Sequence, residues 1–328
     1  MKLLPRLIIS CLLGALIIWY LGGLEEIIAI ISQTDLRYLL AGALVLTLDR
    51  ILMTYKWSLL LHSRGLQLPL MRGTTIYCAS MIWGMFLPST VGSDAIRAFM
   101  TCRGGLDSNN VIASIVVERM IGFISALLVG LIGLLILDQT GDLDPRFQPV
   151  WWIGGIMLGG AILIFGISLS HSLFDFIYQK MPERLLRNKI AVRLQKLHKT
   201  YADYHTNKKI LTRFFGLTFG EQFSLVIFNW LIALGLGIDV GLLFMAGVLP
   251  LTLLISRLPV SINGLGVFEG VFILVLSLGG ISAAEAVSIA VTGRMLEVVS
   301  YLPWWLAYVI NDGTIRLPTP LQDRHPNA

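Results

Sequence analysis

Residues 255–270 read I-S-R-L-P-V-S-I-N-G-L-G-V-F-E-G, and long apolar runs lie on both sides of them. Proline cannot donate the backbone hydrogen bond of a helix, and glycine favours unwound backbone. Pro259, Asn263 and Gly264 therefore predict that a helix running through this stretch breaks here. At membrane depth, irregular backbone is stable only where it is buried in protein or lines a polar cavity. The stretch thus predicts a polar cavity inside a bundle of membrane helices.

A second stretch in the first half of the chain has the same character. Residues 86–97 read F-L-P-S-T-V-G-S-D-A-I-R, and Pro88 and Gly92 predict another helix break. Two broken segments in corresponding halves of a chain are typical of the substrate site of a transporter.

The composition excludes a soluble globular class. The 328 residues are 55% hydrophobic and 14% charged, with a mean hydropathy of +0.77, whereas a soluble domain is about a quarter charged. The net charge of +5 comes from basic residues clustered in loops, so it does not indicate a nucleic-acid partner. The three cysteines and five histidines show no metal-ligand spacing, and we expect neither a metal nor another cofactor.

Apolar length predicts the membrane spans. About 20 apolar residues cross the ~30 Å hydrocarbon core of a bilayer. Two stretches, 73–87 and 240–278, are too short or too interrupted for one full crossing. Six segments are long enough: 3–22, 36–61, 111–137, 151–169, 214–236 and 284–310.

Loop charge predicts the orientation, because cytoplasmic loops carry an excess of Lys and Arg. Residues 171–213 carry ten Lys and Arg against three acids, whereas the loops at 24–35 and 138–149 are acidic. The number of membrane crossings places these loops on the sides that their charges predict only if residues 73–96 form a re-entrant hairpin from the cytoplasmic side. By the same count, residues 240–278 dip in from the other side, and both termini are cytoplasmic.

The sequence therefore predicts an all-α polytopic membrane protein with about six full spans and two oppositely oriented re-entrant hairpins. We expect a single transmembrane domain over residues 1–312, including the basic cytoplasmic loop 171–213, followed by a polar tail over 313–328.

A weak internal similarity predicts an inverted repeat. The segment L-P-S-T-V-G at 87–92 resembles L-P-V-S-I-N-G at 258–264, and an Arg-Met pair follows each copy within a later span. The intervals from Pro to Arg differ, 31 residues against 35, so chance similarity between apolar segments stays open as the alternative.

Charged residues in or beside the spans are the candidate site. A charge at the centre of a membrane helix raises the free energy of insertion by roughly 2.5–3.5 kcal/mol on insertion scales. Each charged side chain within a span should therefore face protein or water. One reading is a set of ion pairs that hold helices together, and the other is a cavity that binds a charged headgroup. The residues concerned are Asp94, Arg97, Glu118, Arg119, Glu269, Arg294 and Glu297.

The second break could supply a seat for a phosphate group. Asn263, Gly264 and Gly266 would offer free backbone N–H groups at the start of a half-helix, where the helix dipole also favours an anion. Arg119 and Arg294 could pair with the same phosphate through their planar guanidinium groups. Glu269 could instead pair with Arg294 or meet a cationic group of the substrate.

Residues 174–204 form a basic amphipathic segment. Apolar side chains recur at three- and four-residue steps, and Lys and Arg fill the other face. Such a segment could lie on an anionic leaflet. An ordinary cytoplasmic loop explains the charge equally well.

The two broken motifs, together with V-V-E-R-M at 116–120 and G-R-M-L-E at 293–297, resemble a known family. It is the lysylphosphatidylglycerol synthase transmembrane family, the flippase-like domain of the bacterial multiple peptide resistance factor and its stand-alone relatives. The resemblance covers about residues 5–312. Family members usually read Gly-Gly-Asp where this chain has Gly92-Ser93-Asp94.

The resemblance implies an integral protein of the bacterial inner membrane that translocates a phospholipid or a lipid-linked headgroup. The phospholipid would be anionic or aminoacylated, and a lipid-linked sugar is the other substrate class implied. By matching positions, the resemblance implies a headgroup site of Asp94, Arg97, Glu118, Arg119, Asn263, Gly264, Gly266, Glu269 and Arg294.

Two other functions stay open. The chain could be a membrane partner that recruits a soluble synthase through residues 171–213. It could also be a membrane-embedded transferase with Asp94 or Glu269 as general base. Because the aminoacyltransferase domain of the full-length relatives is missing, we expect no lysine transfer from tRNA and no enzyme activity.

Overall fold

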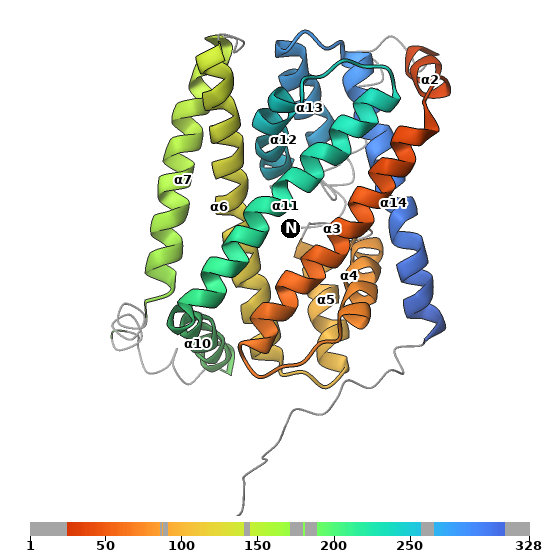
Figure 1. Cartoon of the computed structure of the whole chain (residues 1–328). Coiled ribbons are helices and arrows are strands. Elements are labelled where there is room, and N and C mark those ends of the chain that lie inside the picture. Colours follow the sequence, from red (N-terminus) through yellow and green to blue (C-terminus); the bar gives the residue numbers. More distant parts are fainter. Residues whose placement is uncertain are drawn as a thin grey trace, which may run out of the picture.

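The computed structural model describes residues 25–85, 87, 91–140, 145–170, 180, 189–256 and 266–311. These residues form helices joined by short connections and include no strand, so the predicted all-α class is confirmed (Figure 1). Two 3₁₀ turns cover Pro145–Phe147 and Asp203–Thr206. The helices are α2 (Glu25–Ser32), α3 (Leu36–His62), α4 (Leu70–Gly84), α5 (Val91–Arg103), α6 (Ser108–Thr140), α7 (Gln148–Ser168), α10 (Lys189–Ala202), α11 (Lys208–Gly235), α12 (Leu242–Ser256), α13 (Val267–Leu278) and α14 (Ala283–Ile310).

Three of the described helices, α6, α7 and α11, are long and apolar enough to cross a membrane. They match the spans predicted at 111–137, 151–169 and 214–236. The spans predicted at 36–61 and 284–310 correspond to α3 and α14, which have 27 and 28 residues. The first predicted span and the C-terminal tail lie outside the described residues.

Two pairs of short helices lie at opposite ends of the bundle. Figure 1 shows α4 and α5 in its lower part and α12 and α13 in its upper part, while α3, α6, α11 and α14 run past both pairs. The short helices have 12 to 15 residues, and the two members of each pair pack together. This arrangement agrees with two re-entrant hairpins of opposite orientation.

The helices form two equivalent units, α3–α6 and α11–α14. Their lengths match in order: 27, 15, 13 and 33 residues against 28, 15, 12 and 28. The packing matches too, because α3 lies against α11, α4 against α14 and, equivalently, α12 against α6. Exchanging the units maps the α3–α11 contact onto itself and the α4–α14 contact onto the α12–α6 contact. Since the short pairs point in opposite directions, the units form the inverted repeat that the sequence predicts.

The ends of the bundle separate the charged connections. In Figure 1, α10 lies at the end that holds α4 and α5, whereas α2 lies at the opposite end. The basic segment and the acidic segment at the start of α2 are thus on opposite sides, as the loop charges predict. Which side faces the cytoplasm stays a prediction.

Glycines bring the two units into close contact. Gly133 of α6 faces Gly247 of α12, and a Cβ added to Gly133 would lie 2.7 Å from the Gly247 Cα. A Cβ on Gly130, one turn away, would lie 2.7 Å from the Leu251 side chain. Small residues at such positions allow membrane helices to pack backbone against backbone.

Replacing Gly133 by Val should lower the free energy of unfolding by about 1–3 kcal/mol, because the added methyl groups would push α12 away from α6. The matched control is Gly159→Val in α7, where a Cβ has no neighbour within 4 Å. Thermal unfolding in detergent measures both variants. An equal shift for the two would show that the close approach of α6 and α12 does not contribute to stability.

Candidate functional site

A cavity of about 260 Å³ lies at the centre of the bundle. All eight helices of the two units contribute to its lining, whereas α2, α7 and α10 contribute none. The cavity is therefore built by the repeat itself. Its charged lining residues are Arg50, Lys56, Glu118, Arg119, Glu221, Arg294 and Glu297.

Each unit carries one ion pair between its outgoing short helix and the next long helix. In the first unit, Arg119 Nε of α6 lies 2.6 Å from Asp94 Oδ2 in the first turn of α5. In the second, Arg294 Nη2 of α14 lies 3.1 Å from Glu269 Oε1 in the first turn of α13. The acid precedes its arginine by 25 residues in both units. The two ion pairs are thus equivalent positions of the repeat.

Glu269 also caps its own helix. Its Oε2 accepts a hydrogen bond of 2.7 Å from the backbone N–H of Gly266, the residue that precedes α13. Gly266 has φ +79°, a conformation that residues other than glycine rarely adopt. The capped helix start holds the Glu269 carboxylate in position to meet Arg294.

The first unit has a further buried cation, Arg97 of α5. Its Nη2 lies 3.1 Å from Asp94 and 2.8 Å from Glu118, and its guanidinium is 4.4 Å from the ring centre of Tyr77. The Tyr77 hydroxyl donates to Glu118 at 3.2 Å, and the ring centre of Trp57 lies 4.6 Å from the Arg97 guanidinium. Only 1% of the Arg97 side chain is exposed, so this cluster is fully enclosed.

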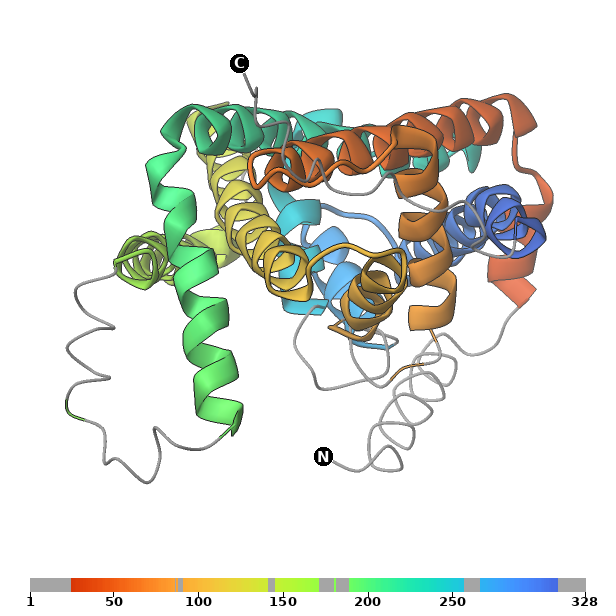
Figure 2. The same cartoon turned by 90° about the horizontal axis from the view of Figure 1, so that it is seen from below.

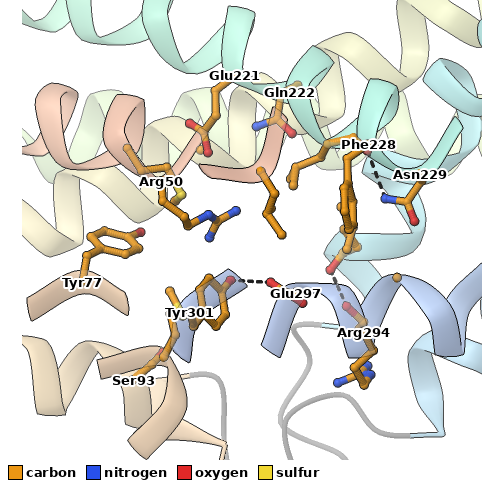
Figure 3. Close-up of a pocket in the computed structure, with 18 of the residues that line it drawn as sticks. Arg50, Tyr77, Ser93, Glu221, Gln222, Phe228, Asn229, Arg294, Glu297 and Tyr301 are labelled. Atoms are coloured by element: carbon orange, nitrogen blue, oxygen red, sulfur yellow. Dashed lines mark hydrogen bonds between the residues drawn. The ribbon is translucent and has the colours of Figure 1, made fainter. Parts of the chain in front are cut away.

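A second cluster projects into the cavity from α3 and α14. Arg50 pairs with its neighbour Asp49 at 2.6 Å and lies over the Tyr301 ring at 5.6 Å. The Tyr301 hydroxyl donates to Glu297 at 2.5 Å. Figure 3 shows the Arg50 guanidinium reaching from α3 toward Tyr301 and Glu297 on α14. Among the described residues, Glu297 makes no ion pair.

A third pair joins the two units directly. Lys56 of α3 forms a buried ion pair with Glu221 of α11 and donates to the Thr218 hydroxyl at 3.2 Å. The Lys56 ammonium also lies 5.3 Å from the centre of the Phe214 ring. Because both charges are almost fully enclosed, their attraction is little screened by water.

The cavity can bind an anion through unused donors. The Nε atoms of Arg50 and Arg294 are buried and have no hydrogen-bond partner among the described residues. A buried donor without a partner is unfavourable, so a ligand that supplies an oxygen atom would be stabilised there. The described residues contain no group of three His, Cys, Asp or Glu side chains placed to hold a metal ion.

The family model of the lysylphosphatidylglycerol synthase transmembrane region matches residues 7–304. The chain belongs to this family. No curated protein sequence matches the chain. Family membership makes this a membrane protein of a lipid-modification or flippase type, and it confirms the resemblance seen in the motifs.

Four predicted site residues of this family member line the cavity: Glu118, Arg119, Arg294 and Glu297. Three others, Asp94, Arg97 and Glu269, do not line it but form ion pairs with residues that do. Gly266 caps the helix that carries Glu269. Glu118, Arg119 and Arg294 thus both face the cavity and take part in a structural ion pair. Glu297 faces the cavity without an ion pair among the described residues.

The backbone breaks are described only in part. Pro88, Pro259, Asn263 and Gly264 lie outside the described residues. Gly92 was predicted at a break, but it lies inside the first turn of α5, which begins at Val91. Its role is close packing, because a Cβ there would lie 2.5 Å from the Leu87 Cβ.

Sequence reasoning left several cavity residues out of the site. Arg50 and Lys56 stand out in the sequence as charges within a span, and the insertion cost of such charges was the available signal. Glu221 carries the same signal in α11. No feature of the sequence singled out Tyr77 and Tyr301, because aromatic residues are common in membrane helices.

Breaking the enclosed cluster around Arg97 should destabilise the fold strongly. Arg97→Gln should lower the free energy of unfolding by about 3–5 kcal/mol, because it leaves the buried Glu118 carboxylate without its cation. Glu118→Gln should lower it by less, because Arg97 keeps its ion pair with Asp94. The double variant should lose less than the sum of the two. Thermal and denaturant unfolding in detergent measure all three.

The control is Arg213→Gln, which removes a hydrogen bond from an exposed arginine to the Tyr55 hydroxyl. It should change the stability by about 1 kcal/mol or less. Additive effects of Arg97→Gln and Glu118→Gln would show that the two side chains do not depend on each other.

Proposed function

We propose that this protein moves phospholipid headgroups across the membrane through the central cavity. The observation that carries the proposal is a charged cavity lined by all eight helices of an inverted repeat. Transporters built from inverted repeats bind their substrates at the interface of the repeats, beside discontinuous helices. Here the short helices α5 and α13 each bring one acid to that interface.

The size of the cavity favours a headgroup as the transported part. Its volume of about 260 Å³ is below the range of roughly 300–1,000 Å³ that is typical of sites for drug-sized ligands. A polar headgroup would occupy the cavity while the acyl chains stay in the bilayer. Burial of the charged headgroup among charged side chains lowers the barrier that pure hydrocarbon imposes.

The lining chemistry favours a headgroup with a phosphate. Arg50 and Arg294 have planar guanidinium groups that suit phosphate oxygens, and each has a buried nitrogen without a hydrogen-bond partner among the described residues. Glu297 offers a carboxylate for a cationic group, such as the amine of an aminoacylated lipid. Both the anionic and the aminoacylated phospholipids are therefore within the proposed class, and lipid-linked sugars with a phosphate are the neighbouring class.

The equivalent ion pairs suggest how binding of the headgroup could lead to movement of a short helix and opening of the cavity. Arg294 lines the cavity and also pairs with Glu269, so a bound phosphate would compete with Glu269 for this arginine. Loss of the ion pair would loosen α13 from α14. Because Arg119 and Asp94 are equivalent in the other unit, the same exchange could open the opposite side.

We further propose that the protein acts in a bacterial inner membrane with both termini in the cytoplasm, and that it transports rather than catalyses. The basic segment at α10 supports this orientation through the excess of Lys and Arg. Recruitment of a soluble synthase is the second candidate, supported by the same basic segment.

Lipid scrambling in proteoliposomes tests the proposal. A fluorescent phosphatidylglycerol is placed in both leaflets, and a membrane-impermeant quencher bleaches the outer one. The wild-type protein should carry inner-leaflet lipid to the outer leaflet, where its fluorescence is lost. Arg294→Ala should slow this loss of fluorescence by about tenfold or more, because a charge-assisted hydrogen bond is worth about 1.5–3 kcal/mol. Glu269→Gln should also slow it, because the site then lacks the carboxylate that returns Arg294 and α13 to the closed position after the headgroup leaves. Arg37→Ala, at an exposed position near the start of α3, should not.

Equal traces for protein-free and wild-type vesicles, with both phosphatidylglycerol and an aminoacylated lipid, would contradict transport and favour the recruiting function. Full transport by Arg294→Ala would instead contradict the assignment of the site to the central cavity.

A further inference from the structure

We infer that α10 is an interfacial helix whose basic residues bind the anionic headgroups of the adjacent leaflet. The helix α10 contributes no residue to the lining of the central cavity, so lipid binding at α10 does not depend on transport. For α10, the described helix of the basic segment at 174–204, the inference favours the leaflet over an ordinary loop.

The direction of α10 differs from that of the spanning helices. Figure 2 looks along the bundle, so α7 is seen end-on, whereas α10 is seen side-on and extends outward past the bundle. Figure 1 places α10 at the lower end of α6, α7 and α11. The helix therefore runs across the end of the bundle, in the plane that a membrane surface would occupy.

Hydrogen bonds fix the depth of α10. The Tyr201 hydroxyl lies 2.7 Å from the Ser168 hydroxyl, and His198 Nε2 lies 3.0 Å from the Ser168 carbonyl oxygen. Ser168 is the last residue of α7, a 21-residue apolar helix whose apolar stretch is only 11% buried inside the protein. Because lipid must cover α7, its end marks the boundary of the hydrocarbon layer. The helix α10 is thus attached at that boundary.

Further contacts hold the C-terminal end of α10 to the bundle. Arg64, which follows α3, donates to the Thr200 carbonyl at 3.2 Å and pairs with Asp203 at 2.9 Å. The side chains of Leu197 and Tyr201 pack into the cluster around Phe214. These contacts set the orientation of the whole helix.

The apolar side of α10 continues past these contacts. Leu194, Leu197 and Tyr201 recur at three- and four-residue steps and so share one face. Tyr201 is buried, but Leu194 is 56% exposed. Among the described residues, Leu194 belongs to none of the buried hydrophobic clusters. At the boundary of the hydrocarbon layer, lipid is the surface that would cover it.

A cationic strip borders this apolar face of α10. Arg193, Lys196 and Lys199 are exposed, and the sequence from Lys189 to Ala202 contains no acid. No salt bridge of these three side chains occurs among the described residues. Long basic side chains beside an apolar stripe are typical of helices that lie on an anionic leaflet, where they reach the lipid phosphates.

An acidic protein partner would fit the charge of α10 but not its depth. Such a partner would have to cover Leu194 at the level of the lipid boundary that Ser168 marks. An anionic leaflet satisfies the charge, the exposed apolar side chain and the depth together, so we assign the surface to lipid.

Hydrogen exchange in nanodiscs tests the assignment on the full chain. Backbone amides around 192–197 should exchange about tenfold more slowly in bilayers with phosphatidylglycerol than in neutral phosphatidylcholine, because docking on anionic lipid suppresses local opening. The triple variant Arg193→Gln, Lys196→Gln, Lys199→Gln should lose this difference. The charge-conserving variant Arg193→Lys, Lys196→Arg, Lys199→Arg should keep it.

Exchange in α6 and α11 should be the same in all variants, which shows that the bundle is intact. Equal exchange of residues 192–197 in the two bilayers would overturn the inference and leave this face to a protein partner. A difference that persists in the triple Gln variant would also overturn it, because the basic residues would then not be the ligands.

Discussion

Burial of charge in a membrane bundle is the constraint on which this structure depends. A charged side chain at that depth is tolerated only with a partner or in a polar cavity. Each outgoing short helix carries an acid in its first turn, and an arginine 25 residues later neutralises it from the next long helix. These pairs, Asp94–Arg119 and Glu269–Arg294, hold the inner ends of α5 and α13 against the bundle. The cavity exists because the short helices stop at this level.

The two units are equivalent in shape but not in strength. Three residues after Asp94 comes Arg97, which Glu118 and two aromatic rings enclose. Three residues after Glu269 comes Phe272, which is fully buried, and the residue before Arg294 is Gly293 rather than an acid. Among the described residues, the first hairpin is therefore held by a network of four charges, whereas one ion pair and apolar packing hold the second. Under the proposed transport, this inequality would favour one of the two open states.

The sequence predicted the fold class, the short helix pairs and most charges of the site, because each depends on local signals: apolar length, Pro and Gly, and charges within spans. It could not predict which charges meet. Lys56 and Glu221 are 165 residues apart, and only the packing of α3 against α11 joins them. The sequence similarity between the two units is weak for a physical reason as well. The helices α4 and α12 start 172 residues apart but α6 and α14 start 175 apart, so a comparison at one fixed offset loses register near the breaks.

The proposed transport requires that opening one hairpin be only slightly unfavourable. Most of the interactions inside the bundle, such as the Lys56–Glu221 pair and the glycine contacts of α6 with α12, join long helices or whole units and can stay intact while one short helix moves. The interaction that changes is a single partly exposed ion pair, since the Arg294 side chain is 28% exposed. Exchange of its carboxylate for a phosphate oxygen replaces one charge-assisted contact by another of similar strength. A substrate with the right charge could thus shift the balance between the two states, whereas a neutral headgroup would leave the ion pair closed.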